Sequence, residues 1–185
     1  MTTDNPWTIL SEKDIYQNNW IKLTEFQVLN PAKNPGIYGK VHFKNLAIGI
    51  IVLDENFFTY LVGQYRFPLN QYSWEIPEGG SSLDKDPLEG AKRELLEETG
   101  LVAHRWTPIQ TMHLSNSVSD EYGIIYLAQD LEQHTACPEE TEQLVIQKLP
   151  FQKAYEMVEK GIITDSLSVA AILKVKLMLL DGRIF

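Results

Sequence analysis

An uninterrupted apolar run, Leu46-Ala-Ile-Gly-Ile-Ile-Val-Leu53, constrains the fold of this chain more than any other feature. A strand without a polar face has to be covered on both sides, as in sheets that carry helices on both faces. Strand-like patterns surround it, and helical patterns lie later in the chain. The pattern predicts an α/β (α+β) fold with a mixed central sheet and helices packed on it. We expect strands within 8–29 (two of them) and at 38–43, 57–65, 108–114, 122–129 and 143–149, and helices at 87–99, 151–160 and 166–180.

The helix predicted at 87–99 has clear signals at both ends. Asp86 is placed to cap the first backbone N–H groups, Pro87 suits the first helical position, and Glu89 completes a box-like pairing. Gly100 follows the last helical residue, as glycine commonly does. For the last helix, Ser166 is the expected N-cap.

Three carboxylates of the 87–99 helix fall beside its core-facing stripe, not around a solvent face. At 3.6 residues per turn, the stripe consists of Leu88, Ala91 and Leu95, and the adjoining arc carries Glu94, Glu97 and Glu98. Oxygen ligands grouped in this way suit Mg²⁺, with Mn²⁺ as a possible substitute. Taken alone, the same residues are also compatible with an ordinary surface helix.

The surroundings of this helix favour the metal site. The stretch Gly79-x5-Lys85-x7-Arg93-Glu94-Leu95-Leu96-Glu97-Glu98-Thr99-Gly100-Leu101 resembles the Nudix box, and departs from it only at Lys85, where the family has Glu. The resemblance implies a Nudix-type α/β/α sandwich over 45–185, with the box at 79–101 as a loop–helix–loop. It also implies a small amino-terminal β subdomain over 1–44 that supplies dimer and base contacts.

Further segments resemble the ADP-ribose and nucleoside-diphosphate-sugar branch of that family. They are Ile15-Tyr-Gln-Asn-Asn-Trp20-Ile-Lys-Leu, Val62-Gly-Gln-Tyr-Arg66-Phe-Pro, Trp74-Glu-Ile-Pro-Glu-Gly79 and Leu114-Ser-Asn-Ser-Val-Ser-Asp-Glu121. The resemblance covers roughly residues 8 to 180.

The resemblance implies a set of metal and catalytic residues. Glu94, Glu98 and the backbone carbonyl of Glu78 are the expected ligands, and Glu97 supports them or shares a second ion. Glu142 is expected as an additional ligand, and Glu140 or Glu142 as the general base. A solvated acidic loop is the alternative for these last two. Gly79, Arg93 and Gly100 are the structural positions of the box.

The resemblance also implies substrate contacts. Arg66 is expected to bind the phosphates and Glu121 to lie near the substrate. Trp20 and Tyr38 match positions where aromatic rings stack on the base, often from the partner subunit of a homodimer. Without the resemblance, Arg66 could be a solvated charge and Trp20 a core residue.

Composition limits the expected binding partners, cellular location and metal. The net charge of −9 makes nucleic acid a poor partner, because negative surfaces repel each other. The single cysteine, Cys137, fits a reducing compartment, and no apolar run is long enough for a membrane span or follows a basic segment as a signal would. We therefore expect a cytoplasmic protein without membrane contact. The four histidines are scattered, which argues against zinc.

The predicted function is Mg²⁺-dependent hydrolysis of the diphosphate bond of a nucleoside diphosphate sugar. ADP-ribose or a related ADP-sugar is the expected substrate, and a nucleoside monophosphate and a sugar phosphate are the products. One alternative is a Nudix hydrolase for another derivative, such as GDP-mannose, a dinucleotide or an oxidised triphosphate. The other is a non-catalytic Nudix domain that senses a nucleotide, for which Lys85 is the one hint.

Overall fold

The computed structural model describes residues 4–136 and 143–184, which form two compact units. The first unit comprises residues 1–45 and 113–121, and the second comprises 46–112 and 122–185. The first unit therefore includes a segment, 113–121, that the sequence division placed in the second. Among the described residues, no helix has the length and apolar character that crossing a membrane requires.

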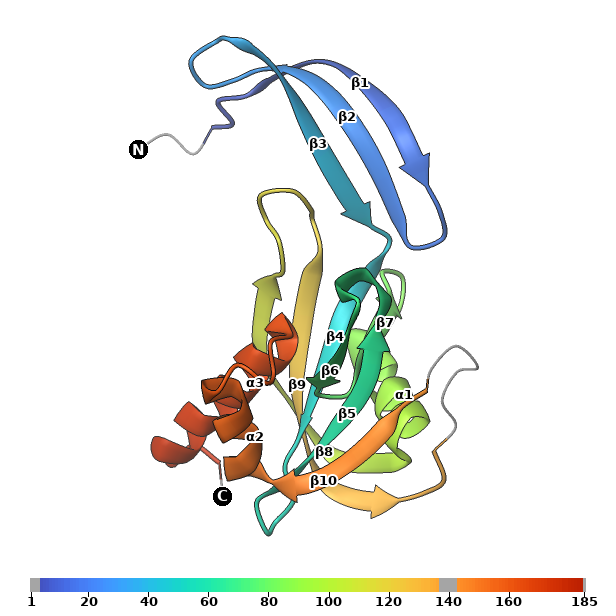
Figure 1. Cartoon of the computed structure of the whole chain (residues 1–185), viewed down its shortest axis with the longest axis vertical. Helices are drawn as coiled ribbons and strands as arrows, with labels where there is room; N and C mark the ends of the chain where they lie inside the picture. The colour runs from blue at the N-terminus through green and yellow to red at the C-terminus, as the bar shows by residue number, and fades with distance from the viewer. Residues whose placement is uncertain (1–3, 137–142, 185) are drawn as a thin grey trace. The chain divides into compact units, whose positions relative to one another are not determined.

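The first unit is built on an antiparallel sheet of β1 (Thr8–Gln17), β2 (Ile21–Leu29) and β3 (Pro35–Phe43), in the order β1-β2-β3 (Figure 1). The 113–121 segment attaches to β3, since the Val41 N–H donates to the Val118 carbonyl at 2.9 Å. The Asp120 carboxylate strengthens this attachment, lying 2.8 Å from both Lys40 and His42. Hydrogen bonds and charge thus hold a remote segment to the sheet.

Two sheets form the centre of the second unit. The first has the order β7-β4-β9-β8, and the second has the order β10-β5-β6, joined by antiparallel pairs. Within the first sheet, β4 and β9 run parallel. The strands are β4 (Asn45–Val52), β5 (Phe58–Arg66), β6 (Gln71–Glu75), β7 (Glu78–Ser82), β8 (Leu101–His113), β9 (Tyr122–Gln133) and β10 (Val145–Pro150), and a short 3-10 helix, η1 (Phe67–Leu69), joins β5 to β6.

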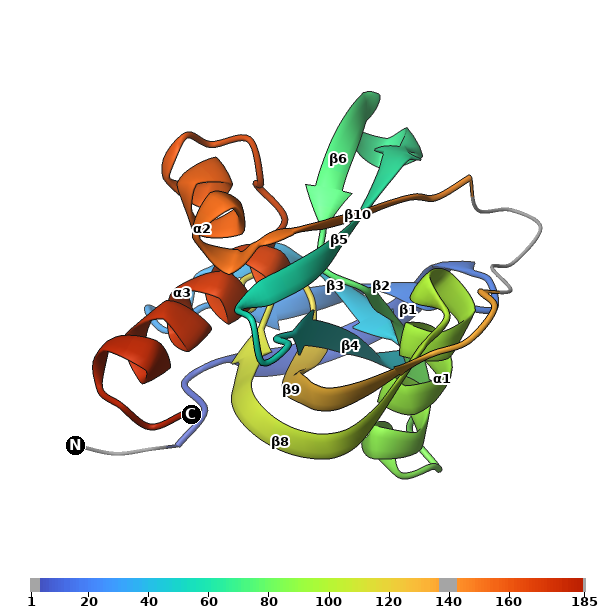
Figure 2. The ribbon, with the colours of Figure 1, turned by 90° about the horizontal axis from the view of Figure 1, so that it is seen from below.

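Helices cover this second unit on two sides. Figures 1 and 2 show α1 (Pro87–Thr99) on one side of β4 and β9, and α2 (Phe151–Glu159) with α3 (Ser166–Leu180) on the other. On the α1 side, Ile48 and Ile50 belong to one buried cluster with Leu95. On the opposite face of β4, Gly49 lies beside Leu167 of α3. The apolar run at 46–53 is therefore buried on both faces, and the mixed α/β/α arrangement expected from the sequence is confirmed.

The helix ends agree closely with the sequence signals. Helix α1 has the predicted bounds, Asp86 accepts a hydrogen bond from Leu88 N at 3.0 Å, and Gly100 ends the helix with a φ of 72°. Glu89 does not complete the expected box, and its carboxylate instead accepts from Lys92 at 2.7 Å. The N-cap prediction for α3 was wrong. The cap is Asp165, because its carboxylate reaches Ser168 N at 2.7 Å, and Ser166 is already helical.

The sequence pattern missed the two strands that follow η1. β6 and β7 lie on either side of Pro77, and β7 contains Gly79 and Gly80, where the resemblance to the box implied a loop. Strand β8 also begins at Leu101, earlier than the predicted 108. Sheet pairing overrode a weak local strand propensity at these positions.

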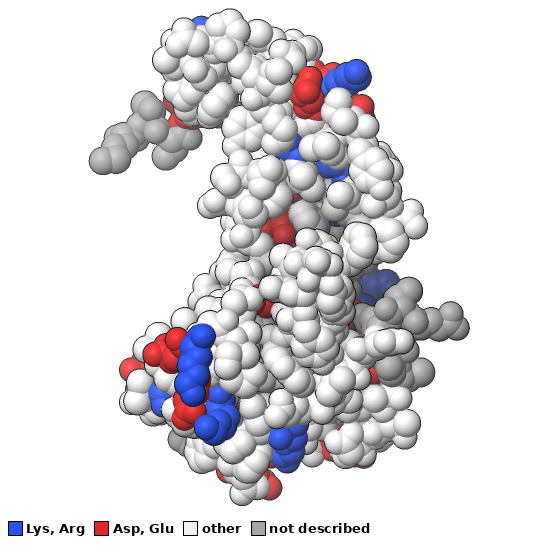
Figure 3. Space-filling view, in the orientation of Figure 1, with Lys and Arg blue, Asp and Glu red and all other residues white. Residues whose placement is uncertain are grey.

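Charges of both signs are mixed on the helical surface of the second unit. On the face drawn in Figure 3, basic and acidic side chains stand side by side over α2 and α3. Ion pairs within single helices include Lys153–Glu156 at 2.9 Å and Lys92–Glu89 at 2.7 Å.

Two neighbouring leucines of α1 provide a test of the core assignment. Leu95 is 0% exposed, whereas Leu96 is 38% exposed. We expect Leu95→Ala to lower the free energy of unfolding by about 2–5 kcal/mol, because it leaves a cavity between α1 and the sheet. The matched control Leu96→Ala should cost less than about 1 kcal/mol. Urea unfolding followed by circular dichroism measures both, and equal losses would contradict this packing.

Candidate active site

Two glycines allow α1 to pack closely against β7. A Cβ at Gly79 would lie 2.2–2.5 Å from the carboxylate atoms of Glu94, and a Cβ at Gly90 would lie 2.6 Å from the Ser81 hydroxyl. Real side chains do not approach this closely, so both positions require glycine for this geometry. The Glu94 carboxylate therefore occupies the space that a side chain at Gly79 would fill.

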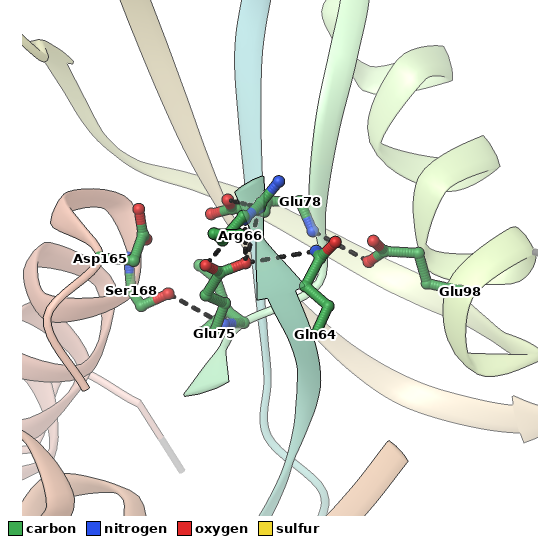
Figure 4. Close-up of polar contacts among 8 residues, drawn as sticks. Gln64, Arg66, Glu75, Glu78, Glu98, Asp165 and Ser168 are labelled. Atoms are coloured by element: carbon green, nitrogen blue, oxygen red, sulfur yellow. Dashed lines mark hydrogen bonds and ion pairs between the residues drawn. The ribbon is translucent and has the colours of Figure 1, made fainter. Parts of the chain in front are cut away.

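A buried carboxylate links the same helix to the start of β7. Glu98 is 1% exposed, and its Oε2 accepts a hydrogen bond from the Glu78 N–H at 3.0 Å (Figure 4). This bond brings the backbone of Glu78 next to the acidic face of α1. The carboxylates expected to bind metal thus meet the main chain that was expected to contribute a carbonyl.

Arg93 compensates the charge of the other two helix carboxylates. Its guanidinium donates to Glu94 Oε1 and to Glu97 Oε2, each at 2.6 Å, and to the Gly80 carbonyl at 2.8 Å. Glu94 and Glu97 are three residues apart and therefore neighbours on the helix surface, where their like charges would otherwise repel each other. The box arginine therefore anchors the acidic face to β7, which supports its expected structural role.

Arg66 lies at the end of β5 in a second acidic group (Figure 4). Its Nε donates to both oxygens of Glu75 at 2.9 and 3.0 Å. Its Nη2 donates to Glu75 Oε2 and to Glu78 Oε1, both at 2.6 Å. These bonds involve Nε and Nη2 of the guanidinium. Glu75 is only 2% exposed, so it holds the guanidinium in a fixed orientation.

Burial shapes the electrostatics of this group. It raises the pKa of the Glu78 carboxyl well above its usual range, and the nearby Asp165 and Glu75 carboxylates raise it further. Burial alone would lower the pKa of Arg66, but its bond to Glu75 and the charges of Glu78 and Glu75 raise it. Arg66 therefore remains charged.

The donor set at the α1–β7 contact fits a hard divalent cation. Among the described residues, no three His, Cys, Asp or Glu side chains by themselves form a metal-binding group. The expected ligands, however, combine the Glu94 and Glu98 carboxylates with the Glu78 main-chain carbonyl, and oxygen ligands of this kind suit Mg²⁺. The space left by Gly79 for the Glu94 carboxylate is consistent with that arrangement.

Three predicted substrate residues lie in or at the edge of the first unit. Trp20 is 65% exposed. The Tyr38 hydroxyl donates to the Ser117 carbonyl at 2.7 Å, and its ring packs edge-on against Trp7 at 5.3 Å. The Glu121 carbonyl accepts a hydrogen bond from Leu114 N at 3.2 Å. A cavity of about 410 Å³ beside Tyr38 is lined by aromatic, apolar and polar side chains that include Phe26 and Lys40.

The remaining residues are the two loop glutamates, the lysine that departs from the box and a glutamate to which the sequence analysis gave no role. Glu140 and Glu142 lie outside the described residues. Lys85, at the departure from the box, is exposed in the turn before α1, and its N–H donates to the Ser82 carbonyl at 3.2 Å. Glu75 was quoted within a motif but not assigned a role. Its position as a charged residue between the apolar Trp74 and Ile76 was the signal that could have identified it.

Comparison with known proteins gives the family. A family model described as NUDIX domain matches residues 43–164. The chain is 32% identical over 133 residues to an ADP-ribose pyrophosphatase of Mycobacterium tuberculosis, covering 70% of this chain and 64% of that relative's length. It is 28% identical over 128 residues to an ADP-ribose pyrophosphatase of Bacillus subtilis, covering 68% of this chain and 69% of the relative.

A solved structure shares the fold. It is described as the crystal structure of an ADP compounds hydrolase and superposes with a TM-score of 0.86 over 100% of both chains, at 19% identity. The box geometry on α1 and β7, the match of the family model and the shared fold agree with one another, and the chain belongs to the Nudix family.

Proposed function

We propose that this chain hydrolyses the diphosphate bond of a nucleoside diphosphate sugar, most readily ADP-ribose or a related ADP-sugar. The observation that carries the proposal is the contact of the Glu98 carboxylate with the Glu78 backbone, beside Glu94. Relatives at 32% and 28% identity are named ADP-ribose pyrophosphatases, which supports the choice of substrate class. The products would be a nucleoside monophosphate and a sugar phosphate.

Mg²⁺ is the proposed cofactor, with Mn²⁺ as a substitute. Glu94, Glu98 and the Glu78 carbonyl would hold it, together with Glu142, which lies outside the described residues. When bound, such an ion neutralises phosphate charge and lowers the pKa of a coordinated water. Glu97 would support the ligands through Arg93, to which it bonds at 2.6 Å.

The chain's own residues would act on the substrate in two ways. Arg66, held by Glu75, would direct its guanidinium at a phosphate oxygen and orient the diphosphate. Glu140 or Glu142 would take the proton from the attacking water as its oxygen bonds to phosphorus. The bridging P–O bond then breaks, and the departing phosphate keeps the electron pair.

We further propose a homodimer in which the first unit supplies base contacts through Trp20 and Tyr38. Large apolar side chains of this unit are exposed, with Trp20 at 65% and Ile37 at 67%. Such exposure is typical of surfaces that are covered in an assembly. Analytical ultracentrifugation should give a dimer mass, and a monomer at micromolar concentration would contradict the proposal.

A cytoplasmic location is proposed from the single cysteine, Cys137, which leaves no internal disulfide to form. Cell fractionation of the tagged protein tests this, and recovery in another compartment would contradict it.

A substrate panel tests the proposed activity. ADP-ribose, ADP-glucose, GDP-mannose and a nucleoside triphosphate, each with Mg²⁺, should give the highest kcat/KM for an ADP-sugar, with AMP among its products. Preference for the triphosphate would contradict the substrate class. Binding of ADP-ribose without any hydrolysis would instead identify a nucleotide-sensing domain.

Replacement of one metal ligand should abolish most turnover. Glu98→Gln keeps the size of the side chain and can still accept from Glu78 N–H, so we expect an unchanged fold. We expect kcat to fall by at least about 100-fold, in the range of lost electrostatic catalysis. Steady-state kinetics at saturating Mg²⁺ measure this, with circular dichroism as the check on folding. Normal turnover would remove Glu98 from the metal site.

The space above Gly79 offers a more selective test. In Gly79→Ala the new Cβ would meet the Glu94 carboxylate at 2.2–2.5 Å and would displace that side chain. We expect the Mg²⁺ concentration for half-maximal activity to rise by roughly 10-fold, as for the loss of one charge-assisted contact. Gly36→Ala is the control, since a Cβ there meets no atom within 4 Å. An equal response of both variants would refute the role of Gly79.

A further inference from the structure

The segment from Glu75 to Glu78 carries three functions of the site within four residues. The Glu75 carboxylate orients Arg66, the Glu78 N–H binds Glu98, and the Glu78 carbonyl is an expected metal ligand. The chain leaves β6 at Glu75 and enters β7 at Glu78, so Ile76 and Pro77 form a short link between strands. The position of this link therefore affects both the arginine and the metal ligands.

Three different elements hold this segment in place. From β4, the Ile50 N–H donates to the Pro77 carbonyl at 2.8 Å. From α1, Glu98 accepts from Glu78 N–H at 3.0 Å. From α3, the Ser168 hydroxyl accepts from Ile76 N–H at 2.9 Å (Figure 4). Two of these bonds use a side chain, Glu98 and Ser168. Glu98 belongs to the box, whereas Ser168 lies outside it.

The hydrogen bond between Ser168 and Ile76 is buried, so bulk water cannot replace the hydroxyl as the acceptor. Ser168 and Ile76 are both 0% exposed. A Cβ at Gly49 would lie 3.0 Å from Ile76 Cδ1 and 3.4 Å from Leu167 Cβ, which shows how tightly β4, Ile76 and α3 pack. A buried N–H without an acceptor is costly, so loss of the hydroxyl should displace the link.

Helix α3 is well fixed at this point. Asp165 caps it by accepting from Ser168 N–H at 2.7 Å, so main chain and side chain of Ser168 are both bound. We propose that Ser168 is a positioning residue for the reaction. Through Ile76 it sets the Glu75–Glu78 segment against α1, so that Arg66 and the Glu78 carbonyl face the same substrate. This inference rests on the proposed metal-dependent hydrolysis.

The test compares Ser168→Ala with a control on the same helix. The control is Ala171→Gly. Ala171 lies about one turn further along α3 and is also 0% exposed. Its replacement by glycine destabilises the helix but removes no atom of the Ser168–Ile76 hydrogen bond. In Ser168→Ala we expect a rise of roughly 10-fold in the Mg²⁺ concentration for half-maximal activity, and a similar fall in kcat. Ser168→Thr, which keeps the hydroxyl, should restore the Mg²⁺ dependence.

Two further readouts separate this inference from general stability and from the function itself. Hydrogen exchange of the Ile76 amide should accelerate in Ser168→Ala and not in Ala171→Gly. Mn²⁺ affinity, measured by electron paramagnetic resonance, should fall in Ser168→Ala even if ADP-ribose proves not to be a substrate. Wild-type Mg²⁺ and Mn²⁺ dependence in Ser168→Ala would overturn the role of Ser168. So would an equal loss in Ala171→Gly, or a folded Ser168→Thr that behaves like Ser168→Ala.

Discussion

The hydrogen bond between the Glu78 N–H and the buried Glu98 carboxylate is the contact on which the site depends. It joins the strand that carries a main-chain oxygen to the helix that carries the acidic side chains. A carboxylate that is 1% exposed is costly unless it is bonded or bound to a cation. The Glu78 amide satisfies Oε2 of this carboxylate and ties it to the start of β7.

Charge balance explains how so many acidic groups gather without unfolding the unit. Arg93 bonds to Glu94 and Glu97, and Arg66 bonds to Glu75 and Glu78. Each guanidinium carries several N–H donors in a fixed planar arrangement, so it can bond to two carboxylates at once. Burial and the neighbouring Asp165 and Glu75 carboxylates raise the pKa of the Glu78 carboxyl, and the bond from Arg66 counters this. The arginines therefore organise the acidic surface on which the proposed chemistry depends.

Much of helix α1 was predictable from the sequence. The bounds of α1, its Asp86 cap and its Gly100 stop were correct, because each rests on a local backbone preference. The acidic arc beside the core stripe followed from helical periodicity alone. The strands β6 and β7 were not predicted. β7 pairs with β4, which lies well before it in the chain, and this pairing outweighs its glycines. β6, in contrast, pairs with the preceding strand β5. The Asp165 cap was missed because two adjacent residues were both suitable caps.

The site was predicted less completely than the helix. Arg66 was identified as a candidate, but its two carboxylate partners were not, because they come from β6 and β7. The role of Ser168 was not predictable from a motif. A serine near the start of a helix usually suggests a cap, not a contact with a distant segment. Its contact with Ile76 joins residues 92 positions apart.

Short-range spacing on one helix encodes the family pattern, the helix of the box and the residue types of the proposed cation site, so the sequence was sufficient to predict them. The tertiary structure alone decided which acids are buried, which arginine serves which pair, and that α3 holds the link before the box. Those features depend on long-range packing, where burial and hydrogen bonds act between segments that no local pattern connects.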